Sequence, residues 1–383
     1  MSSRGNELPV RSGIREMMDL AATLEDVIHL ELGEPDFPTP PHVVEAVQKA
    51  LRGGDVKYTL SRGDIELRRL IAEKLRQRNG IDAQPERVVV TTGGTSAVFA
   101  ALLATIESGD GVLIPDPGWP TFEVATLLAR GRPVRYSLSP ESGFQPDLDE
   151  LDLLARDARV LILNSPSNPT GAVLPRATVE RILEIAARHD LLILSDEVYE
   201  EIVFEGETVS PASLDEDGRV ISVFSFSKDY AMTGWRIGYL HGSRDIVEAV
   251  VRIQEAMIAC PSWPAQRAAE AALAGPKDVL AARRAEYQAR RDLAAERLEA
   301  HGLLAGRPAG AFYILARIGA PDLDTFDFSH RLLRQELVAV APGETFGPGG
   351  AGLVRLSLAS SPEAIAAGID RLAHFVAATP ARS

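Results

Sequence analysis

The chain has 383 residues, of which 45% are hydrophobic and 25% are charged, a composition typical of a globular protein with more than one hydrophobic core. Its formal net charge of -14 disfavours nucleic acid or an anionic membrane as a partner, because phosphate binding needs concentrated lysine and arginine. No apolar run approaches the roughly 20 residues that a membrane-spanning helix needs, so we predict no span.

The N-terminal residues and the single cysteine indicate a cytoplasmic protein. Residues 1–30 mix charges throughout and lack the continuous apolar core of a secretory signal. Cys260 has no partner for an internal disulfide, which fits a reducing compartment. We interpret Cys260 as a small buried side chain, because no motif supports it as a nucleophile.

From about residue 87 to residue 242, short β-branched runs alternate with helical patterns. We predict seven strands here, in the segments RVVVTTGG, GVLIPDP, RPVRYSL, RVLILNSP, LLILSDEVY, VISVFSFSK and WRIGYLHG. Residues 177–190, between the fourth and fifth strands, carry apolar side chains at helical spacing. This alternation predicts a mainly parallel sheet with helices on both faces, whose ligands bind where the strands end.

After residue 242 the pattern becomes helical, in RDIVEAVVRIQEAM and then in a long stretch at about residues 265–301. The C-terminal part contains the predicted strands GAFYILARI, LVAVAPG and LVRLSLA and the predicted helices FSHRLLRQE and SPEAIAAGIDRLAHFVAAT. We predict a large domain at residues 41–280 and a smaller α+β domain at residues 281–383. Residues 1–40 have too little apolar pattern for a domain, and we expect them to pack with the small domain.

Lys228 is one of only five lysines among the 40 basic residues, and it follows the predicted strand VISVFSFS. The ordinary interpretation of such a residue is an exposed loop lysine. A buried lysine amine instead shifts towards its neutral form, which suits Schiff-base chemistry with a carbonyl. The choice depends on whether the rest of a carbonyl cofactor site is present.

Asp196 and Tyr199 lie at the end of another predicted strand, three residues apart. Asp196 could cap the next turn, and Tyr199 could be a half-buried aromatic residue. Alternatively, a carboxylate in a partly dry site keeps a pyridine nitrogen protonated, because a neighbouring negative charge favours the cation. Tyr199 could then hydrogen-bond a ring oxygen on the opposite side.

One loop and two arginines are candidate sites for anions, and a second loop is rich in turn-forming residues. The segment TTGGTSA runs from a strand through two glycines into a helical pattern, where backbone amides and the Thr95 hydroxyl can bind phosphate. The segment NSPSNPTG could be an ordinary turn after a strand. Arg236 and Arg355 could be surface residues, but a guanidinium fork also suits phosphate or carboxylate.

Motifs for other chemistries lack support. The segment GPGGAG at residues 347–352 satisfies G-x-G-x-x-G by letter but precedes a strand and opens no helix, so we reject a dinucleotide site. The chain has no G-x-S-x-G, H-E-x-x-H or paired C-x-x-C motif, and its seven histidines show no ligand spacing. We therefore expect neither a metal enzyme nor a serine hydrolase.

Taken in order, these stretches resemble the class I/II aminotransferases, the fold-type-I enzymes that use pyridoxal 5′-phosphate (PLP). The resemblance covers about residues 11–375, and its most specific segment is SFSKDYAMTGWRIGY. The other matching segments are GEPDFPTP, KYTLSRGDIELR, TTGGTSA, PDPGWPTF, NSPSNPTG, SDEVYEEIVF, GAFY and PGETFGPGGAGLVRLSLA. It implies an α/β fold with a seven-stranded, mainly parallel sheet in the large domain and a smaller α+β domain.

The resemblance also implies a role for each matching residue. Lys228 resembles the lysine that forms a Schiff base with PLP, and Asp196 resembles the acid beside the pyridine nitrogen. Tyr199 and Asn168 match residues that hydrogen-bond the phenolic oxygen, and Trp119 stands where an aromatic ring, often Tyr in relatives, stacks on the pyridine. The remaining implied ligands are Gly94, Thr95, Ser225 and Arg236 at the phosphate, Arg355 at the α-carboxylate of the substrate, and Gly33 on the covering loop.

Partner and substrate are likewise implied by resemblance. Tyr58 resembles a tyrosine that reaches the phosphate of the neighbouring subunit, which implies a homodimer. Thr95 stands where some relatives with acidic substrates have lysine, which favours neutral or aromatic amino donors, with aspartate left open. We find no residue to assign to a side-chain carboxylate, and the segment SGIREMMDL could reshape the pocket. The implied acceptor is 2-oxoglutarate or pyruvate.

Three other functions can be compared with this resemblance. A PLP-dependent C–S lyase, or another β-eliminating or cyclising enzyme, uses the same fold and cofactor residues. A PLP-bearing transcription regulator is not expected, because the match begins at about residue 11 and the chain is acidic. A nucleotide-binding α/β protein without catalysis would make every matching motif a coincidence.

Overall fold

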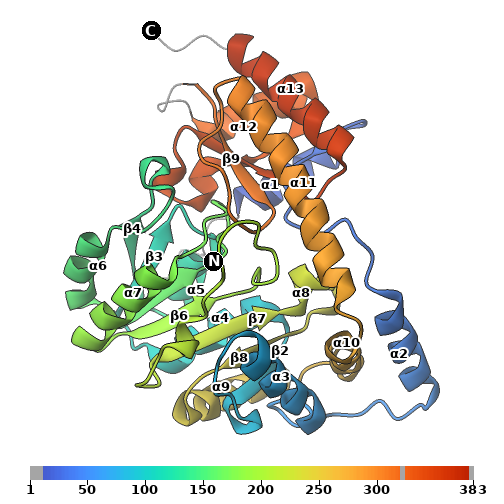
Figure 1. The fold of residues 1–383 in the computed structure, drawn as a ribbon, viewed down its shortest axis with the longest axis vertical. Coiled ribbons are helices and arrows are strands. Elements are labelled where there is room, and N and C mark those ends of the chain that lie inside the picture. Colours follow the sequence, from blue (N-terminus) through green and yellow to red (C-terminus); the bar gives the residue numbers. More distant parts are fainter. Residues whose placement is uncertain (1–11, 320–323, 379–383) are drawn as a thin grey trace, which may run out of the picture.

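The computed structural model describes residues 12–319 and 324–378. Predictions for residues 1–11 and 379–383, including the last residue of the predicted C-terminal helix, lie outside the described residues. A larger unit is built around one sheet, and a smaller unit packs above it in Figure 1. The long helix α11 (Asp278–Ala300) runs from the larger unit up along the smaller one (Figure 1).

All seven predicted strands form one sheet in the order β2-β8-β7-β6-β5-β3-β4. Only β8 runs against its neighbours, pairing antiparallel with β2 and β7, so the prediction of a mainly parallel sheet is confirmed. The strands are β2 (Val88–Thr91), β3 (Gly111–Asp116), β4 (Arg132–Ser137), β5 (Val160–Asn164), β6 (Leu192–Asp196), β7 (Val220–Ser225) and β8 (Gly238–His241).

Helices cover both faces of this sheet (Figure 1). Along β5, Val160 and Ile162 enter the core that lies under α4, whereas Leu161 and Leu163 enter the core under α7, because successive side chains of a strand point to opposite faces. The predicted helix at residues 177–190 is α7 (Arg176–Arg188). The other helices here are α2 (Pro41–Arg52), α3 (Ile65–Arg78), α4 (Gly93–Thr105), α5 (Thr121–Leu128), α6 (Leu148–Leu154), α8 (Phe226–Asp229) and α9 (Arg244–Ile258).

The helical stretch predicted at residues 265–301 is two helices, α10 (Trp263–Ala274) and α11. The break falls at Gly275, whose backbone is extended and which precedes Pro276. A proline disfavours the helical conformation of the residue before it. A Cβ at Gly275 would also lie 2.2 Å from His42 Nε2, so the turn packs tightly on α2.

The smaller unit contains an antiparallel sheet of order β11-β12-β9, packed against three helices. The predicted strand LVAVAPG is divided between two sheets, because β10 pairs with β1 of the N-terminal segment while β11 pairs with β12. Sequence periodicity cannot reveal which partners a run of apolar residues finds. The elements are β9 (Tyr313–Arg317), α12 (Thr325–Glu336), β10 (Val338–Ala339), β11 (Ala341–Pro342), β12 (Leu353–Ser357) and α13 (Pro362–Ala378).

The N-terminal segment lies against the smaller unit. Its helix α1 (Gly13–Ala21) contacts β10, β11 and α12, and β1 (Ile28–His29) pairs with β10 in parallel. Leu30 is fully buried in the core of the smaller unit. The domain boundaries at residues 40 and 280 stay predictions. Among the described residues, no helix combines the length and apolar composition required to cross a membrane.

Candidate active site

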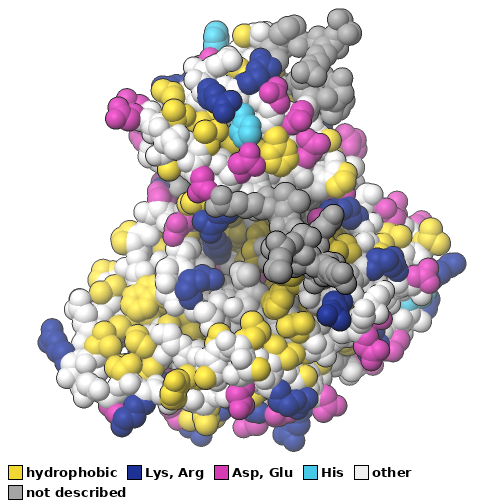
Figure 2. Space-filling view, turned by 180° about the vertical axis from the view of Figure 1, so that it is seen from behind, with side chains coloured by type: hydrophobic (Ala, Val, Ile, Leu, Met, Phe, Trp, Pro, Cys, Tyr) yellow, Lys and Arg dark blue, Asp and Glu magenta, His cyan; other side chains and the backbone are white. Residues whose placement is uncertain are grey.

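A cavity of about 570 Å³ lies where the carboxyl ends of β5, β6 and β7 face the smaller unit and α1. Figure 2 shows basic side chains beside the hollow between the upper and lower parts of the molecule. The cavity brings together the residues predicted from the sequence, with one exception. Its lining includes Gly33, Gly94, Thr95, Trp119, Asn168, Asp196, Tyr199, Ser225, Lys228, Arg236 and Arg355.

The exception is Tyr58, which lies between α2 and α3, outside the cavity lining. Its side chain is 88% exposed, an unusual position for a large aromatic residue. Within this one chain, Tyr58 contributes nothing to the cavity.

Lys228 lies in α8, the single helical turn that follows β7. The Ser225 hydroxyl caps this turn by accepting a hydrogen bond of 3.1 Å from the Ser227 amide. The Lys228 amine donates to the Gly33 carbonyl at 2.6 Å. Burial, with a smaller effect from the Arg355 charge, lowers the pKa of Lys228 to about 8. A larger fraction of this amine than of an exposed lysine is therefore neutral and nucleophilic near neutral pH.

Asp196 is the last residue of β6 and is buried. Its carboxylate accepts a hydrogen bond from the Val198 amide at 3.4 Å, at the long limit of such bonds. Burial raises the pKa of Asp196 to about 7. A buried carboxylate with so little hydrogen bonding is costly in free energy, and a cationic ligand group beside it would offset that cost.

Arg355, on β12, is buried and is held by both units. Its Nη1 donates to Asn168 Oδ1 at 3.0 Å, and its Nη2 donates to the Glu31 carbonyl. The guanidinium lies 4.3 Å from the ring centroid of Tyr313 and 4.9 Å from that of Phe346. Burial lowers the pKa of Arg355, yet the group has no carboxylate partner among the described residues. An unpaired buried cation favours an anionic ligand.

Two tyrosines connect this arginine to the lysine side of the cavity. Tyr199 and Tyr313 share a hydrogen bond of 2.9 Å between their hydroxyls. The Lys228 amine lies 5.9 Å from the centroid of the Tyr199 ring. A Cβ at Gly33 would lie 1.9 Å from the Tyr313 hydroxyl, so only glycine allows the chain to pass here.

The N-terminus of α4 forms a separate wall of the cavity. The helix has no side-chain cap at Thr92, which leaves first-turn amides free for a ligand. Gly93 has a φ of +79°, and a Cβ there would lie 2.7 Å from Arg236 Nη2. The Arg236 guanidinium therefore packs against the start of α4. A cation beside uncapped helix amides is an arrangement that binds phosphate.

Several lining residues were not predicted from the sequence. Tyr313 belongs to the matching segment GAFY, but nothing in the sequence links it to Tyr199. Glu34, whose carboxylate accepts a hydrogen bond from the Thr233 hydroxyl, follows Gly33 directly. Arg15 lies on α1, in the segment SGIREMMDL that we singled out without naming a residue. Its position becomes visible only once α1 is placed in space.

Comparison with known proteins places these features in a family. Residues 25–372 match the family described as "Aminotransferase class I and II". The chain is 41% identical to the aromatic-amino-acid aminotransferase 2 of Thermococcus litoralis and 41% identical to the aspartate aminotransferase of Pyrococcus abyssi, over 94% of each chain. The solved structure of an aromatic aminotransferase from Pyrococcus horikoshii superposes with a TM-score of 0.88 at 39% identity, covering 94% of this chain and 98% of that chain.

Replacing the buried Asp196 carboxylate by a neutral side chain should stabilise the ligand-free chain, and by more at high pH than at low pH. Because the folded-state pKa of Asp196 is raised from 3.8 to about 7, the folded chain loses stability as pH rises through this interval. Asp196→Asn should raise the free energy of unfolding of the ligand-free chain by about 2–4 kcal/mol at pH 8, and by less at pH 5. Calorimetric melting at both pH values measures this.

Asp55→Asn is the matched control, because Asp55 is 75% exposed. Its melting temperature should differ little from that of the wild type at either pH. If Asp196→Asn instead lowered the free energy of unfolding at pH 8, the conclusion that burial of the Asp196 carboxylate destabilises the ligand-free chain would be wrong.

Proposed function

We propose a role for each of the residues that line the cavity. The premise is that the chain belongs to the class I and II aminotransferases and is a PLP-dependent aminotransferase. One observation carries the proposal. The Lys228 amine, whose pKa is lowered to about 8, and the Arg355 guanidinium, which has no carboxylate partner among the described residues, line the same cavity. A nucleophilic amine beside a carboxylate-binding cation is what transfer of an α-amino group requires.

The residues of the cavity fit PLP. The uncapped start of α4 and Arg236 suit a phosphate, and the poorly hydrogen-bonded Asp196 suits a protonated ring nitrogen. The Lys228 amine suits an aldehyde. We propose that Gly94, Thr95 and Ser225 complete the phosphate site, and that Trp119 stacks on the ring.

When bound, PLP accepts the electron pair of the substrate's Cα–H bond and carries the amino group between the two substrates. Lys228 would hold the cofactor covalently, and its amine would take and return the Cα proton of the substrate. Asp196 would keep the ring nitrogen cationic. Tyr199 and Asn168 would hydrogen-bond the phenolic oxygen, and the Tyr313 hydroxyl fixes the position of Tyr199.

We assign the α-carboxylate of both substrates to Arg355. Asn168 and the Glu31 carbonyl hold its guanidinium in one orientation, and the adjacent aromatic rings keep water away from it. Gly33 and Trp119 border the same space and limit how the substrate lies. Fixing the carboxylate orients the Cα–H bond towards the lysine amine, and such orientation lowers the barrier without new chemistry.

We propose an L-amino acid with a neutral, aromatic or aspartate side chain as the amino donor, and 2-oxoglutarate or pyruvate as the acceptor. The names of the relatives support both aromatic and acidic donors. Apolar residues that line the cavity, among them Ile14, Leu32 and Trp119, are compatible with an aromatic side chain. We place the enzyme in the cytoplasm, since its single cysteine suits a reducing compartment.

We further propose a homodimer in which Tyr58 reaches the phosphate site of the partner. Figure 2 shows apolar side chains gathered over the lower part of the molecule, which holds the large sheet. Val56, Leu60 and Met257 are 47%, 60% and 49% exposed, and exposed apolar surface of this kind is typical of an interface. Burial against a second copy would remove this surface from water.

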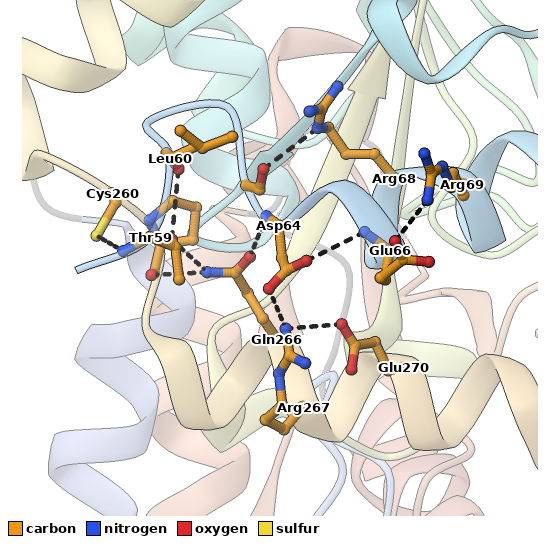
Figure 3. Close-up of polar contacts among 12 residues, drawn as sticks. Thr59, Leu60, Asp64, Glu66, Arg68, Arg69, Cys260, Gln266, Arg267 and Glu270 are labelled. Carbon is orange, nitrogen blue, oxygen red and sulfur yellow. Dashed lines mark hydrogen bonds and ion pairs between the residues drawn. The ribbon is translucent and has the colours of Figure 1, made fainter. Parts of the chain in front are cut away.

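The segment that follows Tyr58 is held by hydrogen bonds to Gln266 and Cys260 (Figure 3). Gln266, which is fully buried, accepts a hydrogen bond from the Asp64 amide at 2.7 Å and donates to Thr59 Oγ1 at 2.9 Å. The Thr59 amide donates to Cys260 Sγ at 3.4 Å. A loop fixed in this way can present one side chain to a partner at little cost in conformational entropy.

Replacing Lys228 tests its proposed role as the anchor of the cofactor and the carrier of the Cα proton. Lys228→Ala should lower the rate of transamination by at least roughly 10³-fold, because the variant lacks both the covalent anchor and the proton carrier. The wild type should be yellow, with an absorbance band that borohydride bleaches. Lys49→Ala, which removes an exposed lysine of α2, should keep the colour and the rate. A Lys228→Ala enzyme that works at the wild-type rate would end the proposal.

Mixed dimers test whether Tyr58 acts across the interface. Tyr58→Phe should weaken PLP binding about tenfold, by removing one hydrogen bond to a charged group. Mixing it with Lys228→Ala chains creates dimers in which an intact lysine faces an intact tyrosine of the other chain. Borohydride fixation reports only the sites with the lysine, and these should regain wild-type PLP affinity. No recovery in the mixed dimers would place Tyr58 outside the partner's site.

A further inference from the structure

We propose that Arg283, on α11, is a positioning residue that fixes both the turn carrying Lys228 and the loop that the Lys228 amine contacts. This inference rests on the proposed function, in which Lys228 holds the cofactor and moves the substrate proton. Arg283 lies outside the cavity lining and is buried, with 8% exposed. The two ends of its guanidinium bind different segments. Nη1 donates to the Asp229 carbonyl at 3.1 Å, and Nη2 donates to the Pro38 carbonyl at 2.6 Å.

The turn that carries Lys228 needs support from outside itself. The helix α8 has only four residues, and so short a helix is unstable alone, because forming one turn fixes several residues for one hydrogen bond. The bond from the Tyr230 amide to the Phe226 carbonyl is 3.3 Å long, which is weak. The last carbonyls of a helix have no partner within it, and Arg283 binds that of Asp229. Arg283 thus holds the backbone directly after Lys228.

The other end of the guanidinium holds the covering loop, residues 33–39. The Phe37 ring contacts both Arg283 and Arg290, whose guanidinium groups lie 5.4 Å and 5.2 Å from its centroid. Arg290 also donates to Asp36 Oδ1 at 2.9 Å. Three consecutive residues of the loop, from Asp36 onwards, are therefore fastened to α11 by charged side chains.

These contacts form a closed ring around Lys228. Its amine donates to the carbonyl of Gly33 at 2.6 Å, and Gly33 lies in the same loop as Pro38. Its backbone continues directly into Asp229. Because Arg283 binds both Asp229 and Pro38, one guanidinium limits the movement of the amine from its backbone and from its hydrogen-bond acceptor. Correct placement of a reacting group accounts for large factors in rate.

The loop is also bound directly to the segment after α8, since the Thr39 hydroxyl donates to the Ala231 carbonyl at 3.0 Å. Arg283 adds the attachment to α11, which runs along both units in Figure 1 and packs against β9 and α13. The strand β9 pairs with β12, which carries Arg355. Arg283 therefore places Lys228 relative to the unit that holds Arg355.

The chemistry of Arg283 argues against a role in packing alone. Both of its acceptors are backbone carbonyls, and no carboxylate forms an ion pair with it among the described residues. Burial lowers the pKa of its guanidinium, which reflects the cost of removing the charge from water. An apolar side chain of similar volume would fill the space at less cost. The feature that only arginine supplies is a rigid fork with donors for two acceptors.

Hydrogen exchange of the ligand-free chain tests whether Arg283 holds both segments. Arg283→Met removes the guanidinium and keeps an unbranched side chain that can fill the space. Amide exchange should accelerate at least roughly tenfold in residues 33–39 and in residues 226–231, because each segment loses a hydrogen bond to a charged group. Mass spectrometry of peptides from the two segments measures this. Unchanged exchange in either segment would overturn the inference.

Capture of PLP by the ligand-free chain tests the placement of the amine. The Lys228 amine adds to the aldehyde carbon, the aldehyde oxygen leaves as water, and an absorbance band reports the new bond. At a temperature where both chains are folded, Arg283→Met should lower the rate constant of capture roughly 10- to 100-fold. In transamination, kcat should fall while KM for both substrates stays within about twofold. Capture at the wild-type rate would contradict the positioning role.

Arg291→Met is the matched control for lost stability. Arg291 is a buried arginine of the same helix, but it contacts Phe204, Glu205 and Pro308 rather than α8 or the covering loop. This variant should lower the melting temperature about as much as Arg283→Met, yet keep wild-type exchange in both segments and wild-type capture. Equal slowing of capture in both variants would overturn the inference. If the wild type captures no PLP, the proposed function fails, whereas hydrogen exchange still decides whether Arg283 holds the two segments.

Discussion

The site depends on charged groups that the fold removes from water without pairing them, among the described residues, with a hydrogen-bonded group of opposite charge. Lys228 and Asp196 stand at the end of a sheet whose strands are buried on both faces, and Arg355 reaches the same cavity from β12 of the smaller unit. Each would be more stable in its charged form if it were solvated or paired. The fold therefore holds these groups at a cost in stability, and their free energy falls when a cofactor and a substrate supply the missing opposite charges.

Close contacts of the backbone at two glycines bring the functional side chains near enough to act on one ligand. Gly33 lets the covering loop approach Tyr313, and Gly93 lets Arg236 lie on the start of α4. In both places a Cβ would push apart two groups that must act on the same ligand. The small unit, the large unit and the N-terminal segment each contribute to the cavity, so it is complete only when all three are packed together.

Local patterns predict most of this architecture. The seven strands and α7 were predictable because an apolar run and helical spacing are each patterns among residues that lie close together in the sequence. Asp196 and Lys228 could be singled out for a similar reason, since each lies beside a strand end, whereas Ser225 was implied only by the family resemblance. The Gly-Pro pair at residues 275 and 276 indicates a helix break, but the helical composition on both sides favoured one continuous helical stretch.

The unpredicted features depend on contacts between segments distant in the chain. The division of LVAVAPG reflects its pairing with β1, more than 300 residues earlier in the sequence. The Tyr199–Tyr313 hydrogen bond and the position of Arg15 likewise need α1 and β9 placed in space. Short-range spacing contains no information on such neighbours, and a charged residue on an amphipathic helix is ordinarily a solvated one.

Mass spectrometry of the reduced enzyme tests the central claim most directly. Borohydride fixes the bond between PLP and the amine that holds it, and peptide mapping then locates the added mass among the five lysines of the chain. The account predicts that the peptide containing Lys228 alone carries the cofactor, at one equivalent per chain. Cofactor fixed on another lysine, with an unmodified Lys228 peptide, would contradict it.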